Sequence, residues 1–194
     1  MIFRRSENVP RLSRYIDYRD RYLRPDFRFR CAYCLTPEFY FQQGDGGEID
    51  HFRPLNPPSS LGLNFSHLRN EYSNLYWSCS RCNTCKGNAW PTRLENEQGH
   101  RFLDPCIEDS DDHWSLKDDG AVEPTTPTGV YTVETIRLNR RRLVWFRKYL
   151  NECAQKLRLL EDTLATKDID AEARLVLIGQ LQILKDITDP PVIP

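Results

Sequence analysis

The chain of 194 residues is long enough for one domain with its own core, or for a small domain with an extension. Hydrophobic residues make up 39% of it and charged residues 28%, which excludes a disordered or fibrous protein, and the formal net charge of −1 gives no indication of a nucleic-acid partner. No apolar run approaches the roughly 20 residues of a membrane span, and the N-terminus lacks a secretory signal, so we expect a cytoplasmic protein without membrane contact.

Charge is distributed unevenly along the chain. Residues 1–30 contain nine arginines and four acidic residues, and residues 137–148 contain six basic residues and no acidic one. Residues 104–123 contain eight acidic residues and one lysine. The basic blocks predict either a cationic face that binds a polyanion or ordinary solvated helix surface, and charge alone favours neither.

The first half of the chain is predicted to contain a helical arm and a cysteine-bearing unit. Residues 1–27 form the basic arm, in which "RLSRYIDYRDRYL" has a helical pattern that Pro25 is expected to end. Residues 28–91 form the cysteine unit. Within it, "EFYFQQ" and "GEIDHF" flank "GDGG" and predict a β-hairpin, "NLYWS" is a further extended run, and a helix follows Cys79 up to Gly87.

The second half is predicted to be irregular at first and then helical. Residues 92–131 are rich in Pro, Gly and Asp and predict an irregular acidic connection. Residues 132–188 predict an antiparallel helical hairpin whose two helices are separated at "TKDID". We expect this hairpin to serve for docking or for dimerisation. The first helix has an apolar seam at alternating spacings of three and four, formed by Leu143, Phe146, Leu150, Cys153, Leu157, Leu160 and Leu164.

Two Cys-x-x-Cys pairs, Cys31 with Cys34 and Cys79 with Cys82, predict a metal site. Each pair can turn two thiolates toward one ion, and two pairs complete a tetrahedral Zn²⁺ site. Four protein ligands leave no open position, so this zinc is structural. Buried cysteines without a metal are the alternative, but a unit with such short strands needs an additional constraint to fold.

Asp50 and His51 stand side by side at the end of an expected strand. Successive strand residues point to opposite sides, so the two side chains can flank a reacting group. A carboxylate suits a hard divalent ion, and a neutral imidazole suits the deprotonation of water. This combination is typical of metal-assisted phosphodiester hydrolysis, although the two residues alone are more simply explained as a hydrogen-bonded surface pair.

Four elements of the sequence follow one another in the order typical of a nuclease family: Cys31-x-x-Cys34, "IDHFRP", Asn74 in "SNLYWSC", and Cys79-x-x-Cys82 followed by "NTCKGN". Over residues 28–91 the chain therefore resembles the HNH endonucleases. The resemblance implies an α+β protein with a small zinc-stapled ββα-metal core (the His-Me finger), an N-terminal helical segment and a C-terminal helical hairpin.

The same resemblance implies a role for each polar residue of the core. His51 would be the general base, Asp50 and Asn83 would bind the catalytic divalent ion, and Asn74 would brace the loop that holds the His51 ring. Many relatives carry His where Asn83 stands, and an amide oxygen favours Mg²⁺ or Mn²⁺ over Zn²⁺. Without the resemblance, Asn74 could close a turn and Asn83 could cap a helix.

Other residues near these positions are weaker candidates. Lys86, Arg53 and Asn88 are candidates for contacts with DNA phosphates. Glu48 lies on the same strand face as Asp50. It either forms a hydrogen bond to a residue that binds the metal or is simply an exposed strand residue.

Two zinc enzyme classes are excluded by their motifs, and one non-enzymatic alternative is not. The chain lacks the His-x-Glu of zinc deaminases and the His-Glu-x-x-His of zinc metalloproteases. A non-catalytic zinc module that binds nucleic acid or protein would explain the cysteines and arginines. It leaves Asp50, His51 and Asn83 without a purpose.

The segments flanking the core, "YLRPDFRFRCAYC" and "ETIRLNRRRLVWFR", resemble those of HNH proteins from bacterial anti-phage systems, Septu-like and retron-associated ones among them. This resemblance implies a defence effector that cleaves DNA beside an ATPase partner, with the C-terminal helices as the docking or homodimer surface. A stand-alone restriction or mobile-element nuclease is the alternative within the same family.

Overall fold

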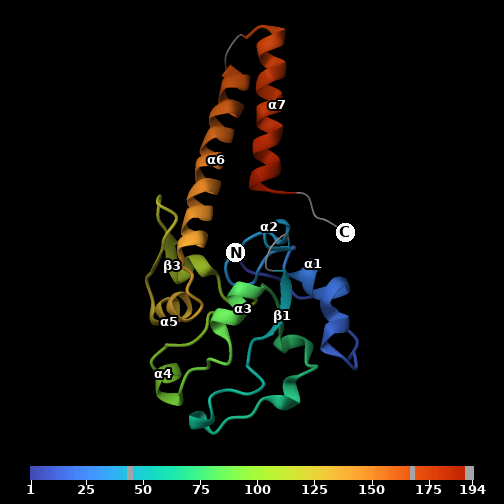
Figure 1. Ribbon diagram of the computed structural model, residues 1–194, viewed down its shortest axis with the longest axis vertical. Helices are drawn as coiled ribbons and strands as arrows, with labels where there is room; N and C mark the ends of the chain where they lie inside the picture. Colours follow the sequence, from blue (N-terminus) through green and yellow to red (C-terminus); the bar gives the residue numbers. More distant parts are fainter. Residues whose placement is uncertain (43–45, 167–168, 191–194) are drawn as a thin grey trace. The chain divides into compact units, whose positions relative to one another are not determined.

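The structure is a computed structural model that describes residues 1–42, 46–166 and 169–190 (Figure 1). Helices and two small sheets build it, which confirms the mixed α+β class. The chain forms two compact units: one comprises Met1–Ser115 and Val122–Asn139, and the other comprises Leu116–Ala121 and the chain from Arg140 onward. All four paired cysteines and His51 belong to the first unit.

The N-terminal arm consists of three consecutive helical turns of different kinds. They are the 3-10 turn η1 (Tyr15–Tyr18), the π turn η2 (Arg19–Leu23) and α1 (Arg24–Asp26). Pro25 was expected to end the helix; it lies within α1, and the helical run ends one residue later, at Asp26. The last turn leads into Phe27, which is fully buried.

The predicted hairpin between "EFYFQQ" and "GEIDHF" is wrong, because the first run is the helix α2 (Glu38–Gln42). Glu38 and Phe41, three residues apart, are both buried, which is the spacing of a helix face rather than of a strand. Trp77 donates its indole N–H to the Glu38 carboxylate at 3.0 Å, and this bond fixes α2. The last residue of that run, Gln43, and the first two of the predicted turn, Gly44 and Asp45, lie outside the described residues.

The strand that contains the Asp-His pair, β1 (Gly47–His51), pairs instead with β2 (Leu75–Cys79). The two strands are antiparallel, with Gly47 opposite Cys79 and His51 opposite Leu75. Every residue of β2 is buried. Gly47 lies directly on the Trp77 ring, since a Cβ atom added at Gly47 would be 2.2 Å from Trp77 Cζ2.

A short helix, α3 (Ser80–Lys86), follows β2 without a loop and lies beside β1 (Figure 1). Its first turn is capped by the Cys79 sulfur, which accepts a hydrogen bond from the Cys82 N–H. Between the two strands, the chain makes three single 3-10 turns: η3 (Ser59–Leu61), η4 (Ser66–Leu68) and η5 (Tyr72–Asn74). Strand, strand and helix therefore meet at the Asp-His pair.

The region expected to be irregular contains several short elements. They are α4 (Arg93–Glu97), the 3-10 turn η6 (Ser110–Asp112), the strands β3 (Trp114–Leu116) and β4 (Val122–Pro124), which pair with each other, and α5 (Pro127–Thr135). α5 begins before residue 132, with Thr126 as its N-cap and Pro127 in its first turn. Both residues are typical of the start of a helix. The helix was not predicted there because the surrounding Pro, Gly and Asp residues are typical of a loop.

The C-terminal part forms two long antiparallel helices, α6 (Arg141–Thr166) and α7 (Ala171–Thr188), which lie side by side (Figure 1). Leu143 and Cys153 of the predicted seam are buried, and its other members are half-buried. Several large apolar side chains on these helices remain exposed, among them Leu159, Leu175 and Ile183. No helix in the described part of the chain combines the length and apolarity needed to cross a membrane.

Candidate metal and catalytic site

The sulfur atoms of Cys31, Cys34, Cys79 and Cys82 all lie within 4.8 Å of one another. The Cys34 and Cys79 sulfurs are 3.9 Å apart, and a tetrahedral site with Zn–S bonds of ~2.3 Å spaces its sulfurs by roughly 3.8 Å. All four residues are buried. The donor set and its spacing therefore fit a tetrahedral metal such as zinc, and no other group of three or more candidate ligands occurs within the described ranges.

The local backbone explains how two distant pairs converge. The Ala32 N–H, between the first two cysteines, donates to the Trp77 carbonyl of β2 at 2.8 Å and brings the first pair onto the strand that leads to the second. Hydrogen bonds from the Cys31 thiol and its neighbours lower the pKa of Cys34 well below its usual range. Metal binding by this cluster requires the thiols to lose their protons, so it is coupled to pH.

His51 ends β1, and its ring is fixed by a backbone carbonyl. Nε2 lies 2.9 Å from the Arg69 carbonyl oxygen. A carbonyl can only accept, so Nε2 carries the hydrogen and donates it. Nδ1 then has a free lone pair, and no side chain or backbone group of the described residues binds it. Burial lowers the pKa of His51, so the ring is neutral near pH 7 and Nδ1 can take a proton.

Three residues that the sequence did not reveal support His51: Tyr15 of the N-terminal arm, and Arg69 and Asn70 between η4 and η5. Tyr15 packs against the His51 ring edge-on, with centroids 5.1 Å apart. Asn70, next to the carbonyl that binds His51, accepts a hydrogen bond from the Tyr15 N–H and donates to the Ser13 carbonyl. No motif marks these residues, because Arg69 acts through its backbone and Asn70 joins segments more than 50 residues apart.

Asn74 lies where a brace for the loop after His51 would be needed. Its side-chain oxygen accepts from the Arg53 N–H at 2.8 Å, and its side-chain nitrogen donates to the Arg53 carbonyl at 3.1 Å. The Asn74 side chain is buried, and the Phe52 N–H donates to the Asn74 carbonyl. These three bonds hold the two residues after His51 in place. The Arg53 side chain itself is exposed.

Asp50 is buried, with 4% of its surface exposed, and it is already paired. Lys86 Nζ lies 3.0 Å from both of its carboxylate oxygens and donates to the His51 carbonyl at 2.8 Å. The Tyr33 hydroxyl also donates to Asp50. Burial raises the pKa of Tyr33, so the hydroxyl keeps its proton.

Lys86 is therefore an internal cation rather than a surface one. Only 1% of its surface is exposed, and burial lowers its pKa while the Asp50 charge opposes that shift. In this arrangement Lys86 cannot reach a DNA phosphate, which was its expected role. Sequence reasoning places a lysine at the surface by default, and only the fold shows that this one pairs with Asp50. Asn88, in the segment after α3, is exposed.

Asn83 lies in the first half of α3 and binds β1 through its side chain. Its Nδ2 donates to Glu48 Oε2 at 2.5 Å. The Asn83 side-chain oxygen accepts no hydrogen bond from the described residues. Glu48 and Asp50 occupy the same face of β1, so α3 contacts this face twice, through Asn83 and through Lys86.

The oxygens available on this face are those a hard divalent cation prefers. Asn83 offers an unoccupied amide oxygen. Asp50 is partly occupied, but a carboxylate has about four lone-pair positions, and Lys86 with Tyr33 use at most three of them. The donor chemistry of Asp50 and Asn83 therefore fits Mg²⁺ or Mn²⁺, and these are the two residues that could hold such a cation.

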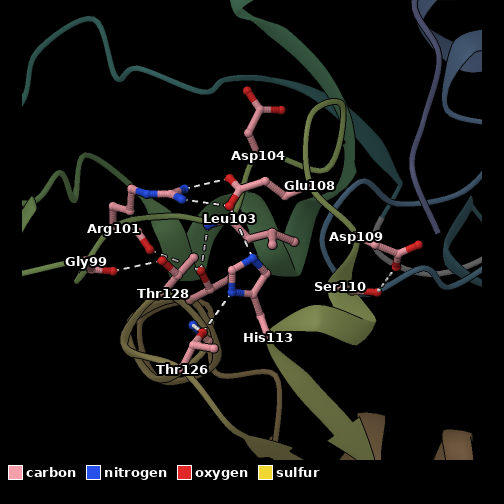
Figure 2. Close-up of polar contacts among 12 residues, drawn as sticks. Gly99, Arg101, Leu103, Asp104, Glu108, Asp109, Ser110, His113, Thr126 and Thr128 are labelled. Atoms are coloured by element: carbon pink, nitrogen blue, oxygen red, sulfur yellow. Dashed lines mark hydrogen bonds and ion pairs between the residues drawn. The ribbon is translucent and has the colours of Figure 1, made fainter.

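A second polar cluster surrounds His113 and is a structural network (Figure 2). The His113 ring lies between Thr126 and Glu108, with Nδ1 2.8 Å from the Thr126 hydroxyl and Nε2 3.2 Å from the Glu108 carboxylate. Arg101 donates twice to Glu108. Thr126 is also the N-cap of α5. Both ring nitrogens of His113 are used to hold the 101–113 segment on α5, so this cluster offers no unoccupied base.

Comparison with known proteins gives two similar sequences, both from Bacillus mycoides (strain KBAB4). The Septu protein PtuB is 31% identical over 140 residues, which cover 62% of this chain and 46% of PtuB. The Septu protein PtuA is 24% identical over 148 residues, which cover 66% of this chain and 20% of PtuA. The chain therefore spans less than half of the length of either relative. No family model and no solved structure matches it significantly.

Proposed function

We propose that the protein is a metal-dependent endonuclease of the HNH type that hydrolyses phosphodiester bonds of DNA in anti-phage defence. The observation that carries this proposal is His51: its Nε2–H is bound to the Arg69 carbonyl, and its Nδ1 is left as a neutral, unoccupied base. The oxygen donors Asp50 and Asn83 come from the preceding residue and from the helix packed on the same strand.

In the proposed reaction His51 acts as the general base. Nδ1 takes a proton from a water molecule, whose oxygen forms the new bond to phosphorus while the bond to the leaving ester oxygen breaks and that oxygen takes a proton from solvent. Arg69 keeps the imidazole in the required tautomer. Asn74 holds the following backbone at Arg53, so the ring stays at the strand end during the reaction.

Two metals have different tasks in this proposal. Zn²⁺ bound by the four cysteines joins the segment before β1 to the β2–α3 junction and supplies stability only. Mg²⁺ or Mn²⁺ at Asp50 and Asn83 would supply electrostatic stabilisation of the charge that develops on the phosphate. Lys86 forms an ion pair with Asp50 beside His51, while Arg53 and Asn88, both exposed, are the candidates for phosphate contacts.

The defence role is supported by the similarity to two Septu proteins. We extend it to a partner: the protein works beside an ATPase, and the exposed apolar side chains of α6 and α7 form the docking surface or a homodimer contact. Co-purification of the two proteins tests this part. A protein that cleaves DNA at full rate by itself and never associates with a partner contradicts it.

The nuclease activity is tested by incubating plasmid DNA with zinc-loaded protein and Mg²⁺ or Mn²⁺, with an EDTA control. We expect nicking or linearisation that EDTA abolishes, and His51→Ala should reduce the rate by about 10²- to 10⁴-fold. DNA binding and zinc content should not change in this variant. Metal-independent cleavage, or DNA binding without any cleavage by the native protein, would contradict the proposal and favour a non-catalytic zinc module.

A further inference from the structure

The Asn83 amide has two ends that differ in chemistry but hardly in shape. One end is an oxygen that accepts hydrogen bonds and binds cations, and the other is an NH₂ group that only donates. Rotation of the amide by a half-turn exchanges them at little steric cost, so the neighbours decide which end faces which way. A cation site that uses Asn83 therefore needs a group that fixes this rotation.

We propose that Glu48 is the positioning residue that turns the Asn83 oxygen toward the divalent cation. The proposal rests on the proposed function, because it concerns how that cation is held. Glu48 is an exposed residue of β1, and its Oε2 accepts the Asn83 Nδ2–H at 2.5 Å. A carboxylate cannot donate, so only the NH₂ end of Asn83 can face it.

The opposite rotation is unfavourable for a simple electrostatic reason. It would bring the Asn83 oxygen against the Glu48 carboxylate at hydrogen-bond distance with no hydrogen between them. With Glu48 in place, the Asn83 oxygen is directed away from Glu48 and accepts no bond from the described residues. Groups that orient ligands in this way contribute to affinity even though they do not touch the metal.

The placement of Glu48 agrees with this task. Glu48 and Asp50 lie two residues apart on one face of β1, and α3 contacts that face at both positions. Asp50 is buried and paired with Lys86, whereas Glu48 is exposed and its carboxylate binds Asn83. The Asp50 carboxylate is therefore the one that can bind the cation, and the Glu48 carboxylate holds the Asn83 amide.

The test is a comparison of Mn²⁺ affinity, measured by calorimetry on zinc-loaded protein without DNA. Glu48→Gln is made in the native chain and in the Asn83→Asp variant. In the native chain we expect Mn²⁺ affinity to fall about tenfold or more, because the amide loses its fixed rotation. In the Asn83→Asp background we expect no loss, because both ends of the new aspartate are oxygens and the glutamine introduced by Glu48→Gln can donate to one of them.

Two results would overturn the inference. An equal loss in both backgrounds would mean that Glu48 acts through its charge or binds the cation directly. Unchanged affinity of Glu48→Gln and of Glu48→Ala in the native chain would mean that Glu48 has no influence on Asn83. Glu71→Gln removes an exposed carboxylate elsewhere in the first unit and is the matched control, for which we expect native affinity.

Failure of the inference can be distinguished from failure of the proposed function. If the native protein binds Mn²⁺ and only the coupling between Glu48 and Asn83 is missing, the cation site stands and the role of Glu48 is refuted. If the native protein binds no Mn²⁺, both are refuted. Zinc content and melting temperature, measured on each variant, show that any loss of affinity arises in a folded chain.

Discussion

At the scale of single residues, the His51 and Asn83 side chains are held in the same way. Each has a polar end that can be turned in two ways, and each is bound through its donor atom by a neighbouring acceptor, Arg69 in one case and Glu48 in the other. The atoms that remain, His51 Nδ1 and the Asn83 oxygen, are those that a proton and a cation require. In both residues the donor atom is held by a hydrogen bond, and the acceptor atom has no partner among the described residues.

The lowered pKa of His51 gives an expected pH dependence of cleavage. Only the neutral ring can act as a base, and burial shifts its pKa below the ordinary value of 6.5. With saturating Mg²⁺ we expect the rate to rise with pH through an inflection below 6.5 and then to level off. The measurement is the single-turnover rate at a series of pH values, and an inflection clearly above the ordinary histidine value would contradict the assignment.

Removing only one partner of the Lys86–Asp50 ion pair should destabilise the protein strongly. Lys86→Met leaves a buried carboxylate without its compensating cation and should lower the free energy of unfolding by about 3–5 kcal/mol. Adding Asp50→Asn should recover part of this loss, because the uncompensated charge is removed. Urea denaturation of the zinc-loaded protein measures both effects.

The matched control is Lys185→Met. Lys185 lies 3.4 Å from Glu161 and is half exposed, so its loss should cost less than about 1 kcal/mol. A Lys86→Met variant that is no less stable than Lys185→Met would contradict the buried pair.

At the scale of elements, features that depend on residues close together in the sequence could be predicted, whereas those that depend on distant segments could not. The seam of α6 was visible because helical spacing is local, and the two cysteine pairs were visible because ligand spacing is local. The strand partner of β1 was missed: "EFYFQQ" lies next to it in sequence, but Gly47 pairs with Cys79, 32 positions later. Sequence patterns show which face a residue occupies, not which distant segment covers it.

Two helical glycines give opposite expectations for the same substitution. A Cβ atom at Gly129 in α5 would lie 2.1 Å from the His113 carbonyl oxygen, so Gly129→Ala should destabilise the protein by about 1–3 kcal/mol. A Cβ atom at Gly179 in α7 meets nothing within 4 Å, so Gly179→Ala should stabilise that helix by about 0.5–1 kcal/mol. Denaturant unfolding of both variants checks the contrast, and effects of the same sign would contradict the close packing at Gly129.

At the scale of the whole molecule, the first unit has short elements and one cysteine cluster that joins segments 45 residues apart. β1 and β2 have five residues each, which is too little sheet to be stable alone. The cluster was predictable from spacing. The network of Lys86, Asp50 and Tyr33 beside it was not, because burial of a lysine is a property of the assembled fold.

Removal of zinc should therefore destabilise this unit strongly. Cys34→Ser, or extraction of the metal by a chelator, should lower the melting temperature by roughly 10 °C or more, as measured by tryptophan fluorescence, to which the buried Trp77 contributes. Cys85→Ser is the control, since Cys85 lies outside the cluster and should leave one zinc per chain. Equal melting temperatures with and without zinc would show that the cluster is not a structural metal site.

The most direct test of the account is the tautomer of His51, read from the ¹⁵N shifts of its ring at neutral pH. The chain has four histidines, and the spectrum of His51→Ala identifies the signals of this one. We expect the proton on Nε2, bound to the Arg69 carbonyl, and none on Nδ1. A ring protonated at Nδ1, or at both nitrogens, would have no free base to offer and would contradict the proposed chemistry.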